Sequence, residues 1–463
     1  MRIVLADLKA LDGYASKDTT AGGYGSRLVP FSRVTFVYNF VKSLFYELPS
    51  IQLGYLAAIA ADHGHEVVYT RDSLLEGDVI LVLSSLVDHR HETAWADAAR
   101  ARGLRVGFLG LAASKVPELF AEHADFVIEG EPESAMLRLV EGERLNGLVS
   151  SPPVSDLDTL PFPRWDLLRE RRDSAAASGL HPAGRQFPLL SSRSCPESCI
   201  YCSHRILAPY RARSVANIIE ELGYLSDRYR RPYIVFRDAL FTEQRDRCLE
   251  LCDEIAARGI SIRFSIETRL DRLDEELLLR LRRAGLETVN FGVESVSPEA
   301  LRRVGRRRIP EEQQRAMVRA CSELGIRSVA FYIFGFLTDT WESISSTIDY
   351  SISLGSTFAQ YKLLTPYPGT ALWPQMQDLI YEREWERFDG FTPTFHHPNL
   401  SAEELRFLLA AAYARFYMRP SFLADCLGLR NRRLRRSLRG LDRWAFRWHA
   451  ALERGTISRA VSC

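Results

Sequence analysis

The chain has 463 residues, 46% of them hydrophobic, and its 60 basic and 59 acidic side chains leave a formal net charge of +1. This length exceeds what one hydrophobic core supports and predicts two or three domains, while the balanced charge excludes a global attraction to nucleic acid. No apolar run is long enough to span a bilayer, and the first residues indicate a buried strand and not a signal peptide. We therefore expect a cytoplasmic protein in which clustered cysteines, among the eight in the chain, bind metal or act chemically.

Residues 1–143 alternate short apolar runs with helical stretches, a pattern typical of a Rossmann-like, doubly wound parallel sheet. The predicted strands are residues 2–7, 66–70, 78–85, 105–110 and 125–130. The predicted helices are residues 52–64 and 92–103. Residues 9–46 interrupt this pattern with glycines and many aromatic side chains, and we expect them to form a long functional loop.

Residues 144–187 are rich in proline and aspartate and predict a linker to a second α/β domain at residues 188–384. The predicted strands of this domain are residues 188–192, 233–237, 261–266, 288–293, 328–336 and 359–364, with helical stretches between them. Six β/α units at this spacing predict a partial parallel barrel, with its active site at the carboxyl ends of the strands. The strand signals then stop, and residues 385–463 predict a helical C-terminal region with helices at 401–419 and 430–454.

A cysteine motif, CPESCIYC at residues 195–202, directly follows the first predicted barrel strand. The thiolates of Cys195, Cys199 and Cys202 suit an iron–sulfur cluster, and three ligands on a cube of four irons leave one iron open to a small molecule. The alternative is a structural zinc site with His204 as the fourth ligand. The position after a barrel strand favours the cluster, because the active face of a barrel lies there.

The motif resembles the signature of the radical S-adenosylmethionine (SAM) superfamily, which is C-x3-C-x2-C with an aromatic residue, here Tyr201, before the last cysteine. The resemblance extends over residues 188–370. It implies that the three cysteines bind a [4Fe-4S] cluster, which holds SAM at its open iron and cleaves it to a 5′-deoxyadenosyl radical. It also implies an electron donor such as flavodoxin or ferredoxin.

Polar or small residues stand at the ends of the predicted barrel strands, where the resemblance implies contacts with SAM. Asp238 follows the second strand and is expected to hold the methionine amino group, and Gly335 ends the fifth strand, where small residues admit adenine. The other candidates are Glu267 and Arg269 at the third strand and Glu294 and Ser295 at the fourth. For each polar residue the alternative is a capping or salt-bridge role.

The carboxyl ends of the N-terminal strands carry small residues that let a large flat ligand approach the backbone. No G-x-G-x-x-G follows the first strand, which argues against a dinucleotide. The order resembles the cobalamin-binding domain that precedes many radical SAM domains, through PSIQLGYLAAIAADHGHEV at 49–67, Gly110, and D-x-V-x-x-G-E-P-E at 125–133. The resemblance implies that cobalamin contacts Ser84, Ser85, Leu86, Gly110, Glu129, Gly130 and Glu131.

The motif D-x-H-x-x-G, which supplies a lower axial histidine to cobalt, is absent from the sequence. His89 and His91 lie near the corresponding loop with a different spacing, and we expect them to be solvated residues at the start of a helix. The cobalamin-dependent radical SAM class commonly lacks this motif, so the cobalt would have no histidine ligand from this domain. A degenerate domain that binds no cobalamin is the alternative.

Residues 412–420 resemble the segment after the barrel in bacteriochlorophyll cyclase-like proteins and methylases of this class. The leading expectation is a methyltransferase that moves a methyl group from methylcobalamin to an unactivated carbon of a natural-product, tetrapyrrole or lipid-like substrate. The alternatives are a cyclase or rearrangement enzyme with the same cofactors and, in another class, a non-catalytic metal- or cobalamin-binding regulator. The basic residues 430–454 either contact an anionic membrane surface or form a solvated face packed on the barrel.

Two segments are expected to line the substrate channel. Tyr361 and Tyr367, near the end of the sixth strand, would present rings and hydroxyls near the radical. Residues 9–46 would cover the opposite side with the aromatic side chains of Tyr14, Tyr24, Phe31, Phe36 and Tyr38. The alternative is that the tyrosines are ordinary core residues.

Overall fold

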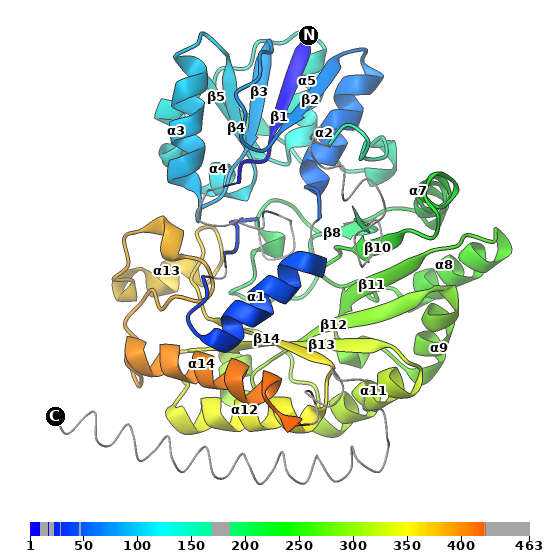
Figure 1. The fold of residues 1–463 in the computed structure, drawn as a ribbon, viewed down its shortest axis with the longest axis vertical. Coiled ribbons are helices and arrows are strands. Elements are labelled where there is room, and N and C mark those ends of the chain that lie inside the picture. The colour runs from blue at the N-terminus through cyan, green and yellow to red at the C-terminus, as the bar shows by residue number, and fades with distance from the viewer. Residues whose placement is uncertain are drawn as a thin grey trace.

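The computed structural model of the protein describes residues 1–9, 17, 23–27, 29–45, 48–168, 186–420 and 422 (Figure 1). Tyr14 and the basic stretch 430–454 lie outside the described residues. Two parallel sheets dominate the described part, one above the other in Figure 1. Within the described residues, no helix is long and apolar enough to cross a membrane.

The first sheet confirms the predicted Rossmann-like, doubly wound arrangement. Its strands are all parallel and lie in the order β2-β1-β3-β4-β5-β6. Their bounds are β1 Arg2–Ala6, β2 Glu66–Thr70, β3 Val79–Leu83, β4 Val106–Leu109, β5 Phe126–Gly130 and β6 Gly147–Ser151. The helices of this part are α2 Ile51–Asp62, α3 His89–Arg100, α4 Leu111–Lys115 and α5 Pro132–Val140.

Alternate side chains of β1 pack against helices on opposite faces of the first sheet. Ile3 and Leu5 belong to the core that contains α2 and α5, whereas Val4 and Ala6 belong to the core that contains α3. Both faces are therefore covered by helices, which explains why the strands are apolar almost throughout.

Residues 147–151 correct the predicted domain boundary. They were expected in the linker but form β6, which pairs with β5 from Phe126–Gly147 to Gly130–Ser151. The sequence GLVSS is short and carries two serines, so its apolar pattern is too weak to predict a strand. The first sheet therefore continues to residue 151.

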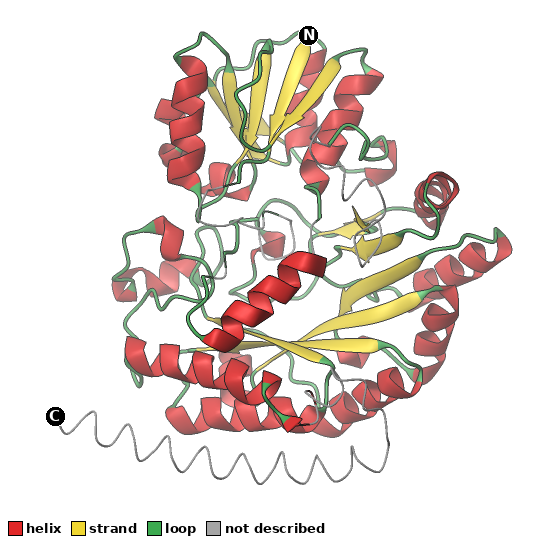
Figure 2. Ribbon diagram, viewed as in Figure 1, coloured by secondary structure: helices red, strands yellow, loops and turns green. Residues whose placement is uncertain are grey.

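The second sheet confirms the six predicted barrel strands. They are all parallel and lie in sequence order, β7-β10-β11-β12-β13-β14, which is the arrangement of an open, partial barrel (Figure 2). Their bounds are β7 Gln186–Leu189, β10 Tyr233–Phe236, β11 Arg263–Thr268, β12 Leu286–Glu294, β13 Arg327–Phe334 and β14 Phe358–Leu363. The connecting helices are α7 Val215–Arg228, α8 Arg245–Ala257, α9 Glu275–Ala284, α10 Pro298–Arg303, α11 Glu311–Glu323 and α12 Trp341–Leu354.

Two further elements complete this half of the molecule. A short antiparallel hairpin of β8 (Ser192–Arg193) and β9 (Arg211–Ala212) flanks the cysteine motif and was not predicted. After the barrel come α13 (Trp373–Met376) and α14 (Ala402–Tyr417), and α14 confirms the predicted helix. Ser401 and Glu404 form a capping box that starts α14.

The segment 9–46 contains a helix where the sequence predicted a loop. Helix α1 (Arg33–Phe45) packs on α14, where the ring of Tyr38 lies 5.4 Å from that of Tyr413 and 5.3 Å from that of Tyr417. Phe36 on α1 is 61% exposed. Tyr38 therefore packs α1 on α14. The exposure of Phe36 does not support a place for this side chain in the predicted channel.

Gly130 offers a test of how tightly the end of the first sheet is packed. Its φ is +115°, and a Cβ at this position would lie 2.1 Å from the carbonyl oxygen of Ser151. We expect Gly130→Ala to lower the free energy of unfolding by about 3 kcal/mol or more, because it adds a backbone clash to a strained φ. Chemical denaturation followed by circular dichroism would measure the loss.

Gly142→Ala is the matched control. Gly142 also has a positive φ, +100°, but a Cβ there would meet no atom within 4 Å. Only the conformational cost of about 1 kcal/mol applies to this variant. Equal destabilisation by the two substitutions would show that the contact with Ser151 is unimportant.

Candidate functional site

The cysteine motif forms a short loop at the carboxyl end of the barrel, between β8 and a 3-10 turn at Ser203–Arg205. Cys199 is buried, and Cys195 and Cys202 are partly buried. Burial raises the pKa of Cys202 to about 12, and the nearby Cys199 and Cys195 also raise it. The three thiols are thus close enough to interact.

This donor set fits an iron–sulfur cluster. In a cubane cluster each thiolate binds a different iron, so the three sulfurs need not converge on one point. Among the described residues, no three His, Cys, Asp or Glu side chains converge in the way that a single metal ion requires. The three thiols could therefore hold three irons of a [4Fe-4S] cluster.

Arg306, which the sequence analysis did not single out, lies beside the cysteine loop. Its Nη1 is 3.9 Å from Sγ of Cys199, and its Nη2 donates to the carbonyl oxygen of Gly292 at 2.6 Å. Nη2 also lies 3.2 Å from Oε1 of Glu294. Arg306 therefore links the cysteine loop to the end of β12.

Glu294 is buried at the end of β12 with a φ of +64°. A Cβ on Gly292 would lie 2.1 Å from Oε1 of Glu294, so the glycine makes room for the ion pair with Arg306. Burial raises the pKa of Glu294, while Arg306 and then Tyr201 act in the opposite direction. Contact of Glu294 with SAM stays a prediction, but the residue already holds Arg306 and Tyr201 in place.

Asp238 is completely buried and fixes the chain just before the cysteine loop. Its carboxylate accepts hydrogen bonds from the backbone N–H of Ser191 at 3.1 Å and from the hydroxyls of Ser191 and Ser192 at 2.6 Å each. These contacts support the alternative structural role that the sequence left open.

Arg269 also holds the cysteine loop. Its guanidinium donates two hydrogen bonds of 2.9 Å to Asp271 and one of 3.1 Å to the carbonyl oxygen of Arg307. A fourth contact, of 3.8 Å, is with Glu197, which lies between the first two cysteines. Glu267, by contrast, is only partly buried, on the strand β11.

Two other predicted residues shape turns. The Ser295 hydroxyl accepts from the N–H of Ser297 at the start of α10. Gly335 has a φ of +85°, and its N–H donates to Asp339 at 3.0 Å. Burial raises the pKa of Asp339 to about 6. These contacts explain both residues without a ligand, and their predicted contacts with SAM remain untested.

The contacts of Tyr361 support the alternative that it is an ordinary core residue. Its side chain is fully buried, its hydroxyl lies 2.6 Å from that of Ser351 on α12, and its ring packs on that of Tyr413 on α14. Because side chains alternate along a strand, its neighbours Gln360 and Lys362 face the opposite, inner side of the barrel. Gln360 and Lys362 were missed because the sequence alone does not show which face of a barrel strand points inward.

Tyr367 lies where the barrel meets the N-terminal segment. Its ring stacks on that of Tyr24 with centroids 5.0 Å apart, and the Tyr24 hydroxyl donates to the carbonyl oxygen of Pro368. On the other side, the carbonyl oxygen of Tyr24 accepts from the N–H of Leu86 at 2.8 Å. The two segments predicted to line a channel therefore do meet, but Tyr24 and Tyr367 contact each other.

The carboxyl edge of the first sheet faces the carboxyl edge of the barrel. Besides the Tyr24 contacts, Lys115 after β4 lies against Gly369, where a Cβ would be 3.0 Å from the lysine side chain. A group bound at the first edge would thus lie towards the cysteine loop, which is the arrangement that cobalamin requires.

Small residues keep two strand ends of this edge together. The Ser84 hydroxyl donates to the carbonyl oxygen of Leu109 at 2.7 Å and accepts from Ala113 at 2.9 Å. A Cβ on Gly110 would lie 3.2 Å from that hydroxyl. The lack of a side chain at Gly110 is compatible with the approach of a large flat ligand. The Ser84 hydroxyl, however, already makes two hydrogen bonds within the protein.

A buried ion pair at the same edge was not predicted. Nζ of Lys17 lies 2.8 Å from Glu92, and the other oxygen of Glu92 accepts from the N–H of Ser85 at 2.8 Å. His89 is also buried, with Nδ1 2.8 Å from the carbonyl oxygen of Leu86. The expectation that His89 is solvated is therefore wrong, because helix α3 begins earlier than predicted and includes it.

Glu131 and Glu133 form a group of ion pairs with Arg193 and Arg211 that we call the interdomain clamp. Arg193, two residues before Cys195, lies 3.2 Å from Glu131 and 2.8 Å from Glu133. Arg211 donates to Glu131 at 3.0 Å. All four side chains are at most 11% exposed. The predicted cobalamin contact Glu131 thus joins the two sheets, whereas Glu129 and Gly130 are partly buried.

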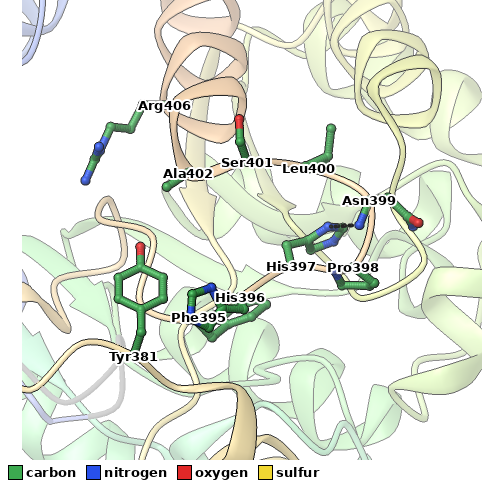
Figure 3. Close-up of a pocket in the computed structure, with 10 residues that line it drawn as sticks. All are labelled: Tyr381, Phe395, His396, His397, Pro398, Asn399, Leu400, Ser401, Ala402 and Arg406. Atoms are coloured by element: carbon green, nitrogen blue, oxygen red, sulfur yellow. Dashed lines mark hydrogen bonds between the residues drawn. The ribbon is translucent and has the colours of Figure 1, made fainter.

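A pocket of about 720 Å³ lies in the C-terminal region, where Figure 3 shows Tyr381 and Arg406 on one side and His397 and Asn399 on the other. Nε2 of His397 lies 2.8 Å from the carbonyl oxygen of Phe336, just after β13. None of the residues predicted from the sequence to bind a cofactor lines this pocket.

The interdomain clamp can be tested by removing one charge. We expect Glu131→Gln to lower the free energy of unfolding by about 3–5 kcal/mol, because it leaves two buried guanidinium groups short of a partner. Urea denaturation at constant pH would measure the change.

Glu143→Gln is the control, since Glu143 pairs with Arg138 at 3.4 Å on the surface, where the two side chains are 52% and 40% exposed. Its loss should cost no more than about 1 kcal/mol. Similar values for both variants would show that the clamp contributes no more than a surface ion pair.

Comparison with known proteins agrees with this geometry. Residues 189–351 match the family described as the Radical SAM superfamily. An uncharacterised methyltransferase of Pyrococcus horikoshii is 30% identical over 342 residues, which cover 69% of this chain and 73% of the relative. The anaerobic magnesium-protoporphyrin IX monomethyl ester cyclase of Rubrivivax gelatinosus is 25% identical, over 65% of this chain and 57% of its own length.

A solved structure has the same fold across nearly the whole chain. It is the radical SAM methyltransferase TsrM from Kitasatospora setae, with cobalamin and a [4Fe-4S] cluster bound. The TM-score is 0.62 at 15% identity, and the match covers 89% of this chain and 88% of TsrM.

Proposed function

The chain belongs to the radical SAM superfamily, and on that basis we propose that it is a cobalamin-dependent methyltransferase acting at an unactivated carbon of a small-molecule substrate. The observation that carries the proposal is the placement of the two sheet edges. The cysteine loop lies at the carboxyl end of the barrel, and the edge of the first sheet faces it through Tyr24, Lys115 and Glu131. A methyl carrier and a radical source need this proximity to act on one substrate carbon.

Methyltransfer is favoured over cyclisation by the relatives. The Pyrococcus relative, named as a methyltransferase, has the higher identity and is matched over more of its length than the cyclase. TsrM, named as a methyltransferase, shares the fold from the first sheet through the barrel. A non-catalytic regulator has no comparable support.

The residues of the chain divide the work in the following way. Cys195, Cys199 and Cys202 hold the cluster. Asp238 fixes the residues just before their loop, and Arg269 contacts Glu197 within it. When bound, the cofactors supply the radical that removes hydrogen and the methyl group that replaces it. The protein's own tasks are to orient substrate and exclude water.

The inner face of the barrel is where substrate would bind. Glu267, Asn290, Phe331, Gln360 and Lys362 all lie on this face and are only partly buried, unlike the alternate residues that pack on the helices. This mixture of charge, amide and aromatic groups suits a substrate with both polar and apolar parts. A natural-product, tetrapyrrole or lipid-like compound has this character.

Cluster assembly and SAM cleavage provide the test. After anaerobic reconstitution with iron and sulfide, the wild-type protein should show a broad brown absorbance and, once reduced, cleave SAM to 5′-deoxyadenosine. Cys199→Ala should lose both properties, because three thiolates are needed to hold the cluster. Iron analysis and chromatography of the SAM products would measure them.

Cys252→Ala is the matched control, since Cys252 is a buried thiol on α8 outside the cysteine loop. It should keep the cluster. During turnover with methylcobalamin and substrate, a methyltransferase forms S-adenosylhomocysteine and 5′-deoxyadenosine in equal amounts. Formation of 5′-deoxyadenosine alone would contradict methyltransfer and favour the cyclase.

A further inference from the structure

Residues 302–308, RRVGRRR, which we call the arginine loop, pack directly against the cysteine loop. The N–H of Ile200 donates to the carbonyl oxygen of Val304 at 3.0 Å. The Ser198 hydroxyl donates to the carbonyl oxygen of Gly305 at 3.4 Å, and a Cβ on Gly305 would lie 2.8 Å from the backbone of Ser198. The backbones of the two loops are therefore in contact.

One arginine of this loop points inward and the others point outward. Arg306 contacts Cys199, as described above. Arg302 is exposed, and the side chains of Arg303, Arg307 and Arg308 are 63%, 57% and 47% exposed. The outward cations are thus within a few residues of the group that touches the predicted cluster ligand.

A further exposed arginine, Arg205, also contacts the cysteine loop. Arg205 comes three residues after Cys202, and its Nη1 donates to the carbonyl oxygen of Glu197 at 3.1 Å. Pro196 and Ser198 of the cysteine loop, on either side of Glu197 in the sequence, are themselves exposed. The loop expected to hold the cluster therefore reaches the surface in the middle of a group of arginines.

Acidic residues neutralise only part of this charge. Arg307 pairs with the mostly buried Asp271 at 3.0 Å and lies 3.9 Å from Glu197. Arg303 pairs with the exposed Glu299 at 3.1 Å, and Arg308 pairs with the partly exposed Glu311 at 3.7 Å. Exposed pairs of this kind contribute about 0–1 kcal/mol, so an incoming carboxylate can compete for the arginines. Since the whole chain has a net charge of only +1, the arginine-rich surface is a local feature.

We propose that the surface formed by the arginine loop and Arg205 docks a small acidic protein that carries an electron on a flavin or an iron–sulfur group. This inference rests on the proposed function, which requires a reduced cluster. The carrier is oxidised by one electron and the cluster is reduced by one electron. No bond forms or breaks, and no proton moves.

Two physical effects favour this site. Clustered cations raise the rate at which an oppositely charged protein arrives, by about 10- to 1,000-fold at low ionic strength. The contact between the arginine loop and Ser198 also leaves little protein between a docked carrier and Cys199. The same surface thus offers both attraction and a short path for the electron.

The test compares two triple variants with equal loss of charge. Arg302, Arg303 and Arg308 change to Gln in the docking variant. The control variant changes Arg258, Arg283 and Arg319, which are exposed on the outer helices α8, α9 and α11 or at their ends. Both leave Arg306 and the cysteines intact. Iron content and the absorbance of the reconstituted cluster verify that each protein is loaded.

Stopped-flow absorbance follows cluster bleaching by reduced flavodoxin and, separately, by reduced ferredoxin. We expect the docking variant to be reduced about tenfold or more slowly at low salt and to lose most of its salt dependence. The control variant should match the wild type, and all three proteins should react equally fast with dithionite.

Equal rates for both variants with the protein donors would overturn the docking proposal while leaving the proposed function intact. A wild-type protein that assembles no cluster would overturn both. If the docking substitutions abolished binding of a DNA duplex but left reduction by the protein donors unchanged, the surface would be a nucleic-acid site and the proposal would be wrong.

Discussion

The position of the cysteine loop depends on buried carboxylates that hold the chain just before it. Asp238 accepts three hydrogen bonds from Ser191 and Ser192, just before the loop. The interdomain clamp binds Arg193, one residue further on. A loop without regular structure has no hydrogen-bonded ladder of its own, so these contacts from other elements fix where its thiols lie. The same clamp aligns the first sheet with that loop, which couples cofactor placement to domain placement.

The sequence predicted the architecture well where hydrophobic periodicity was strong. All six barrel strands and five strands of the first sheet lie where the apolar runs placed them. The elements that were missed include β6, the β8–β9 hairpin and the helices α1, α4 and α5, which are short or carry an unclear apolar pattern. Tertiary pairing decides such segments, and a single sequence contains little information about it.

The site was less predictable for a different reason. The cysteine spacing is a local signal, so it could be found directly. Arg306 stands among four other arginines in seven residues, and nothing in that run distinguishes the one buried beside Cys199 from its exposed neighbours. Glu131 and Asp238 were found at strand ends, but whether such a carboxylate meets a ligand or an arginine or serine from another element depends on contacts distant in sequence.

The first 45 residues have a consequence for how the molecule can move. They supply β1 to the first sheet, Tyr24 to the junction of the two edges and α1 to the cover over α14. A hinge motion that separated the sheets would have to unstack Tyr24 from Tyr367 and slide α1 along α14 at the same time. Both contacts are aromatic and largely buried, so rigid-body opening is resisted at two places far apart. Substrate exchange is therefore expected to proceed by local rearrangement of loops, while the two sheets keep their relative position.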